Sequence, residues 1–347
     1  MRAKIVLILK LSLVGLLLAF LAKKGLLSIE EMKKILTDPQ ALGIALAASV
    51  GNLVICIFRW QLLLRAQQIS LSWIKTARLT LIGNFFNLAL PGAVSGDVVK
   101  AFYIASEHKG RRGHVFGSIL FDRVVGVSGL VLVATLAMLL GSGPLHDNPK
   151  FQPLKGFILL AFVAMLAFYF SLFFIKTSHD PILKILHAAQ RRVAAIASLT
   201  RIYEGVRNYH AHRSMVAMAL VLSCLVHFLA AFSCLQFFEV LDGHEASLWG
   251  IFVAVPLGLL VTAVPIAPAG VGTGHAAFSW LFLLLGSQAG ANIFSLSVVF
   301  QLLFGALGGW VYLRYRTELP EHSSGLVQGR ENSHSTALSS ALSKTSD

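Results

Sequence analysis

The sequence predicts an all-α, polytopic integral membrane protein, and three observations support this prediction. Of the 347 residues, 56% are hydrophobic and only 13% are charged, whereas a soluble domain carries roughly 25% charged residues. Apolar runs long enough to cross a bilayer as helices recur along almost the whole chain. The net charge of +13 comes largely from lysines and arginines in loops beside those runs, which is typical of orientation against an anionic leaflet rather than of nucleic-acid binding. An ordinary soluble enzyme and a mainly disordered protein are therefore excluded.

Seven apolar runs are predicted to be full membrane spans. They cover residues 5–22, 41–60, 115–141, 154–175, 213–238, 248–264 and 291–313. The first run follows Arg2 and Lys4, as a signal peptide would, but a lysine pair follows Ala22 where a small-residue cleavage site is expected. We therefore predict an uncleaved helix there.

The charges of the loops predict the orientation of these spans. Loops 59–78 and 100–112 carry four lysines and arginines each and 176–213 carries seven, whereas 239–247 carries three acids and no lysine or arginine. By the positive-inside rule the first three loops are cytoplasmic and the last is external, with both chain termini cytoplasmic. The four lysines of residues 23–39 oppose this scheme, which places that loop outside.

Residues 79–96 are predicted to form a re-entrant hairpin, because the loops on either side of them lie on the same face. Pro91 cannot continue a helix, and Gly92 beside it permits a sharp turn. Ser95 stands where an N-cap is expected for the next helix. Asp97 then falls in the first turn of that helix, where a carboxylate suits the positive helix end.

A second apolar stretch, residues 265–286, is interrupted in a similar way by prolines and alternating glycines, and Thr273 is placed to cap the helix that follows. The residues of interest in this break are Pro268, Gly270, Gly272, Gly274 and His275. Irregular backbone at membrane depth persists only where it is buried in protein or lines a wet cavity, and paired breaks in two halves of a chain indicate a transporter-like binding site. The alternative for each break is a proline-kinked helix with close glycine packing. The common order of proline, small residues and capped half-helix is also consistent with an internal duplication.

Ionisable side chains inside these segments are candidate binding residues. Asp97 and Lys100 lie three positions apart and can form an ion pair, either within a binding site or as a structural lock. Asp122 and Arg123 are adjacent and point about 100° apart. Arg123 is therefore expected to hold a lipid phosphate, to pair with Asp97 from a neighbouring helix, or to reach towards the interface.

Uncharged polar residues extend this set. Asn84 and Asn87 share a helix face, and each either donates to headgroup oxygens or satisfies the broken backbone. His275 either controls proton passage or is an interior histidine whose ring nitrogens are hydrogen-bonded. His227 is expected to be a buried residue that forms hydrogen bonds. No metal-ligand spacing, nucleotide-binding loop or hydrolase motif is found in the sequence, so no metal and no cofactor are expected.

The regions outside the spans are predicted as follows. Residues 182–196, within the connection 179–207, have the spacing of an amphipathic helix on the cytoplasmic membrane surface, or of a linker packed on the protein. Residues 1–316 form one transmembrane domain, and the polar, aperiodic residues 317–347 form a disordered tail.

The chain resembles the flippase-like family, which comprises the membrane region of lysylphosphatidylglycerol synthases and its stand-alone relatives. The matching motifs are Asn84-x-x-Asn87, Leu90-Pro91-Gly92, Asp97, Lys100, Asp122-Arg123 and the stretch from Pro268 to Gly274. Lys100 stands where arginine is commoner in the family, and His275 stands where glutamate is expected. The resemblance covers most of residues 5–315 and implies movement of a polar-headed lipid across the bilayer. The soluble aminoacyl-transfer domain of the full synthases has no counterpart here, so lipid aminoacylation is not expected.

We therefore expect a transporter of a polar-headed, anionic lipid in the bacterial inner membrane, with membrane lipid as its partner, acting as a monomer or a homo-oligomer. The two hairpins would meet near the midplane around a polar cavity, and their half-helix N-termini would bind phosphate. The expected binding residues are Asn84, Asn87, Pro91, Gly92, Gly96, Asp97, Lys100, Asp122, Arg123, Pro268, Gly270, Gly272, Gly274 and His275. The main alternative is a membrane-embedded glycosyltransferase-type enzyme, against which the basic, acid-poor cytoplasmic loops argue, and a non-catalytic scaffold is a third.

Overall fold

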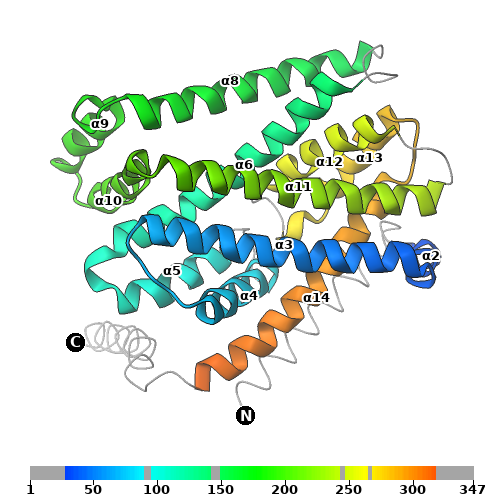
Figure 1. The fold of residues 1–347 in the computed structure, drawn as a ribbon, viewed down its shortest axis with the longest axis horizontal. Helices are drawn as coiled ribbons and strands as arrows, with labels where there is room; N and C mark the ends of the chain where they lie inside the picture. The colour runs from blue at the N-terminus through cyan, green and yellow to red at the C-terminus, as the bar shows by residue number, and fades with distance from the viewer. Residues whose placement is uncertain (1–27, 90–94, 142–148, 243–246, 265–267, 318–347) are drawn as a thin grey trace, which may run out of the picture.

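A computed structural model describes residues 28–89, 95–141, 149–242, 247–264 and 268–317 (Figure 1). Every regular element in these ranges is a helix, and they contain no strand, which confirms the all-α prediction. The predicted span at 5–22 and the predicted tail beyond Thr317 lie outside the described residues.

Five helices of the described chain are long and apolar enough to cross a membrane. They are α3 (Pro39–Ala66), α6 (Arg112–Leu140), α8 (Gln152–Phe174), α11 (Arg213–Asp242) and α14 (Gly290–Thr317). The shortest of them, α8, has 23 residues and is about 34 Å long, enough for a hydrocarbon core of about 30 Å. These helices correspond to five of the predicted spans, and the chain is an integral membrane protein.

The remaining helices are short. They are α2 (Ile29–Thr37), α4 (Trp73–Ala89), α5 (Ser95–Glu107), η1 (Lys109–Arg111), η2 (Pro149–Phe151), η3 (Thr177–His179), α9 (Pro181–Gln190), α10 (Ile196–Arg207), η4 (Asn208–Ala211), α12 (Leu248–Thr262), η5 (Pro268–Gly270) and α13 (Thr273–Leu284).

The structure differs from the sequence prediction at 248–264, which we expected to be a full span. Helix α12 has 15 residues and is about 22 Å long, less than the hydrocarbon thickness. It ends at Thr262, three residues before Pro265, and the two prolines that follow cannot continue a helix. Helix α12 is therefore the first arm of a hairpin whose second arm is α13.

Helices α4 and α5 form the predicted first hairpin, with its two ends on the same face. The ammonium of Lys75, near the start of α4, contacts the carboxylate of Glu107 at the end of α5. Near the break, Gly83 and Gly96 bring the two backbones together. Helix α5 begins at Ser95 itself, and the Ser95 hydroxyl donates to the carbonyl of Phe86 at 2.9 Å. The residue before Ser95 lies outside the described residues, so the role of Ser95 as an N-cap stays a prediction.

The α4–α5 and α12–α13 hairpins enter from opposite faces of the protein. Helix α6 shows this, because Arg111 just before it donates to the carbonyls of Gln67 and Gln68 between α3 and α4. At its other end, Gly141 lies against the side chain of Trp249 at the start of α12. In Figure 1 the two hairpins accordingly lie towards opposite ends of α3 and α11. Helix α4 of the first hairpin packs against η5 of the second.

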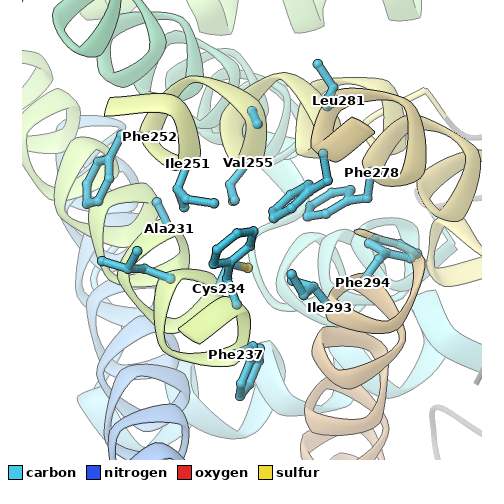
Figure 2. Close-up of a cluster of buried hydrophobic side chains, with 14 of the residues drawn as sticks. Ala231, Cys234, Phe237, Ile251, Phe252, Val255, Phe278, Leu281, Ile293 and Phe294 are labelled. Carbon is cyan, nitrogen blue, oxygen red and sulfur yellow. The ribbon is translucent and has the colours of Figure 1, made fainter. Parts of the chain in front are cut away.

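A hydrophobic core of α11, α12, α13 and α14 supports the α12–α13 hairpin. Figure 2 shows side chains of these four helices converging, among them Val255, Phe278 and Phe294. The rings of Phe278 and Phe294 have centroids 5.0 Å apart, and Phe278 packs directly on Gly258 of α12. Gly258 and Phe278 are equidistant in sequence from Pro268, which is the pairing expected of two antiparallel arms.

The connection 179–207 forms two helices, α9 and α10, rather than the single helix predicted over 182–196. Helix α9 ends at Gln190 and α10 begins at Ile196. Helix α10 packs on α6, with the backbones of Gly113 and Gly205 in close contact. This arrangement favours the alternative of a segment packed on the protein, at least for α10.

A buried ion pair holds the α9–α10 connection to the end of α8. Asp180 caps α9 through its side chain, and its carboxylate pairs with Arg207 at 3.1 Å and accepts from the Tyr203 hydroxyl at 3.0 Å. Burial, together with the Asp180 carboxylate, raises the pKa of Tyr203 to about 12. Arg207 also donates to the carbonyl of Leu172 in the last turn of α8. The packing of this region is therefore fixed by polar contacts that a helical periodicity does not reveal.

Candidate functional site

A cavity of about 480 Å³ lies between the two hairpins, with α4 and η5 in its wall. Its wall is built from α3, α4, α6, α11, α12, η5, α13 and α14, and its volume is within the roughly 300–1,000 Å³ of small-molecule sites. The polar side chains of the wall are those of Ser49, Asn52, Thr80, Asn84, Asn87, Arg123, His227, Ser233, Thr262, Ser297 and Gln301. The structure thus brings polar side chains from six helices, set in a mostly apolar wall, to the place where the sequence predicts a cavity.

Asp97 is the centre of an ion-pair cluster beside this cavity. One of its carboxylate oxygens lies 2.7 Å from the ammonium of Lys100, and the other accepts from Nε of Arg123 at 2.7 Å. Asp97 is only 5% exposed, whereas the Arg123 side chain is 41% exposed and lines the cavity. Both predicted pairings of Asp97 therefore form, and of the three residues it is Arg123 that belongs to the described wall.

Asp122 pairs with Arg59, a residue that the sequence reasoning counted only as a loop cation. The Arg59 guanidinium donates to both oxygens of Asp122, at 2.8 and 3.2 Å, and to the Ser223 hydroxyl at 3.0 Å. Arg59 is 7% exposed inside α3. The sequence does indicate that Arg59 lies within a helix span, because Trp60 and residues 62–64 continue the apolar pattern beyond it. The neighbours Asp122 and Arg123 accordingly bind different partners.

The two asparagines of α4 differ in their surroundings. Asn87 accepts from the backbone N–H of Gly96 at 2.8 Å and so satisfies the backbone at the start of α5. Asn84 is exposed and lines the cavity. The structure thus shows backbone support for Asn87, which also lines the cavity. Pro91 and Gly92 of the same motif lie outside the described residues.

The second break contains three turn positions with positive φ. Ala269, Gly270 and Gly272 have φ values of 52°, 69° and 90°. Gly270 lines the cavity, and the positive φ at Gly270 and Gly272 explains why glycine stands there. Gly274 packs on the ring of Phe294, and Pro268 begins η5. These positions shape the second hairpin tip.

His275 is an interior residue that fixes the start of α13. Its Nδ1 accepts from the backbone N–H of Gly272 at 3.2 Å, so the neutral ring carries its proton on Nε2, which lies 2.9 Å from the Ser295 hydroxyl. At the third position of a helix, a glutamate of a capping box makes the same contact with the N-cap backbone. Helix α13 begins at Thr273, with Gly272 at the N-cap, so the prediction of a Thr273 cap is corrected. His275 is satisfied by these contacts and is not among the described wall residues.

We expect His275→Ala to lower the free energy of unfolding by about 2 kcal/mol, because it removes a helix cap and a partner of a buried hydroxyl. His275→Gln should retain most of the stability, since its amide has both an acceptor and a donor. Thermal unfolding of the purified protein in detergent measures both effects. Equal stability of the alanine variant and the original protein would show that these two bonds do not support the hairpin.

Long apolar helices enclosing two opposed hairpins and an internal cavity define a helical integral membrane protein. The chain belongs to the family described as the lysylphosphatidylglycerol synthase TM region, whose sequence profile matches residues 7–315. This confirms the resemblance found from the motifs. The chain is also similar to UPF0104 membrane protein PH1989 of Pyrococcus horikoshii, with 31% identity over 90 residues, which are 25% of this chain and 27% of that protein. No solved structure matches the chain significantly.

Proposed function

We propose that this protein moves a polar-headed, anionic phospholipid or lipid-linked intermediate between the leaflets of the bacterial inner membrane, with both of its termini cytoplasmic. The observation that carries the proposal is the cavity between two hairpins that enter from opposite faces. A headgroup held there would lie between the two hairpins. Movement of either hairpin would connect the cavity to the corresponding leaflet.

The polar wall supports this function on energetic grounds. A polar headgroup that crosses hydrocarbon without hydrogen bonds loses roughly 2–7 kcal/mol for each amide-like or hydroxyl group, and far more for a charge. Side chains of Asn84, Thr80 and Gln301 on the wall would replace water around the headgroup. The acyl chains would remain in the bilayer. The protein would therefore lower the barrier to crossing without a nucleotide.

Arg123 is the residue proposed to hold the phosphate. Guanidinium groups bind phosphate oxygens through paired, charge-assisted hydrogen bonds. Asp97 fixes the position of the Arg123 side chain at 2.7 Å, and Lys100 holds the other side of Asp97. Asp97 and Lys100 would act by positioning Arg123 rather than by contact with the lipid.

We expect Asp97→Asn and Arg123→Ala each to lower the rate of fluorescent anionic lipid movement in proteoliposomes at least tenfold, which is about 1.4 kcal/mol of barrier. Arg65→Ala is the matched control, because Arg65 is exposed at the end of α3 and is not among the described wall residues. Undiminished rates in both cavity variants would remove these residues from the mechanism. Turnover of a sugar nucleotide with an acceptor lipid, without lipid movement, would support the enzymatic alternative.

A further inference from the structure

Helix α9 is held at the end of a membrane-spanning helix. The Asp180 carboxylate, which caps α9, lies 3.1 Å from Nε of Arg207. Arg207 in turn donates to the carbonyls of Ser171 and Leu172 near the end of α8, at 2.9 and 3.3 Å, and Figure 1 shows α9 at this end of α8. Because α8 is little longer than the hydrocarbon core, its end reaches the headgroup region. Helix α9 therefore starts at the level of the lipid headgroups.

One face of α9 is apolar and exposed. Ile182 and Ile185 lie three positions apart and so on the same side of the helix, and they are 48% and 67% exposed. Leu183, on a different side, is buried, and α9 packs on α10. Packing within the protein thus uses one side of α9 and leaves the isoleucine side uncovered.

The charges along this connection are all of one sign. Between Asp180 and Glu204 the sequence has four lysines and arginines and no aspartate or glutamate. Lys184, Arg191 and Arg192 are exposed, and among the described residues none of the three forms an ion pair. A helix with exposed apolar residues on one side and lysines and arginines on the other is typical of helices that lie on an anionic membrane surface. An acidic protein would match the charges, but it would have to reach isoleucines held at headgroup level.

We infer that α9 binds the surface of an anionic leaflet. Ile182 and Ile185 insert among the first acyl carbons, and Lys184, Arg191 and Arg192 bind the phosphates of the surrounding lipids. This surface is separate from the cavity, whose described wall contains no residue of α9. The inference does not depend on the movement of lipid between leaflets.

The first test measures what surrounds the isoleucine face. A nitroxide label is attached through Ile185→Cys in the full chain, after Cys56, Cys224 and Cys234 have been replaced by alanine, and the protein is reconstituted in vesicles of phosphatidylcholine and phosphatidylglycerol. His187→Cys is the matched control, because position 187 is also exposed on α9 but lies about 200° around the helix from position 185. Oxygen concentrates in lipid, whereas an uncharged nickel chelate stays in water. We expect the ratio of oxygen to chelate accessibility to be at least fivefold higher at position 185 than at position 187.

Each result at position 185 identifies what covers the face. Access to oxygen without access to the chelate supports the inference. Equal access to the chelate at both positions shows that the face lies in water. Exclusion of both reagents shows that protein covers the face, as in an association of two copies of the chain. Either of the last two results overturns the inference.

The second test measures the contribution of the cations. Vesicles of phosphatidylcholine alone, or the triple variant Lys184→Gln/Arg191→Gln/Arg192→Gln, should lower the accessibility ratio at position 185 at least twofold, because the attraction to anionic lipid is lost. Lys33→Gln on α2, which removes an exposed cation from another helix, should leave the ratio unchanged. A ratio that is independent of phosphatidylglycerol overturns the assignment to an anionic leaflet.

The third test uses the unmodified chain, so it does not depend on the cysteine replacements. Trypsin cleaves after Lys184, Arg191 and Arg192, and bound lipid should slow this cleavage because the segment must first open. We expect the rate, relative to cleavage after Lys33 on α2, to be at least fivefold lower in nanodiscs containing phosphatidylglycerol than in nanodiscs of phosphatidylcholine. Equal relative rates would overturn the inference. Slower cleavage without movement of any lipid in proteoliposomes would support it and overturn only the proposed function.

Discussion

Gly96→Ala is expected to prevent the α4–α5 hairpin from closing, with a loss of about 3 kcal/mol or more in the free energy of unfolding. A Cβ at this position would lie 1.8 Å from the carbonyl oxygen of Gly83 and 2.9 Å from Cγ of Asn87. Overpacking costs typically 1–3 kcal/mol where side chains can yield, and here the nearest atoms are backbone. The displacement would also break the hydrogen bond from Gly96 to Asn87. Thermal unfolding in detergent and lipid movement in proteoliposomes measure the two consequences.

The control for this substitution is Gly43→Ala on α3. Among the described residues, no atom outside the local backbone of α3 lies within 4 Å of a Cβ added at Gly43, so the change should be neutral or should stabilise the helix by up to about 1 kcal/mol. A Gly96→Ala variant as stable as the Gly43→Ala variant would show that the two arms of the hairpin are not in contact at this point.

Arg59→Leu should destabilise the protein by about 3–5 kcal/mol, because it leaves the Asp122 carboxylate inside the protein without its counter-charge. The pair is nearly closed to solvent, with side-chain exposures of 8% for Arg59 and 18% for Asp122. The double variant Arg59→Leu/Asp122→Leu should recover a large part of this loss, since replacing both members of a buried pair by apolar residues is often close to neutral. The free energy of unfolding of the two single variants and the double variant gives the coupling between the residues. Additive losses would contradict a direct pair.

The overall plan of the molecule was predictable from the sequence because its determinants are local. The lengths of the apolar runs predict the long helices. The positive charge of loops 59–78 and 100–112 places both on the same face, which predicts that residues 79–96 between them enter and leave by that face. The length of α12 was harder to predict, because residues 248–264 are apolar throughout and only the prolines after Thr262 indicate that the helix stops early. The break between α9 and α10 depends on packing against α6 and on the pair of Asp180 and Arg207, which local periodicity does not show.

Only those contacts of the candidate site that depend on neighbouring residues in the sequence were predictable. Asp97 and Lys100 are neighbours on one helix face, so their ion pair follows from spacing alone. The partner of Asp122 is 63 residues away on α3, and adjacency to Arg123 gave no indication of it. Asn52, Thr80 and His227 come together only because α3, α4 and α11 line one cavity. The role of His275 in capping α13 could not be predicted, because it depends on where the backbone N–H of Gly272 lies in space.

The polar contact near the break differs in strength between the two hairpins. Withdrawing the tip of the α4–α5 hairpin separates Asp97 from Arg123 on α6, and hydrogen bonds to charged groups contribute roughly 1.5–3 kcal/mol each. Withdrawing α13 from α14 breaks the neutral contact of His275 with Ser295, whose class contributes roughly 0.5–1.5 kcal/mol. The first hairpin therefore depends more on a charged contact, whereas the second depends mainly on the apolar packing of Phe278 and Phe294.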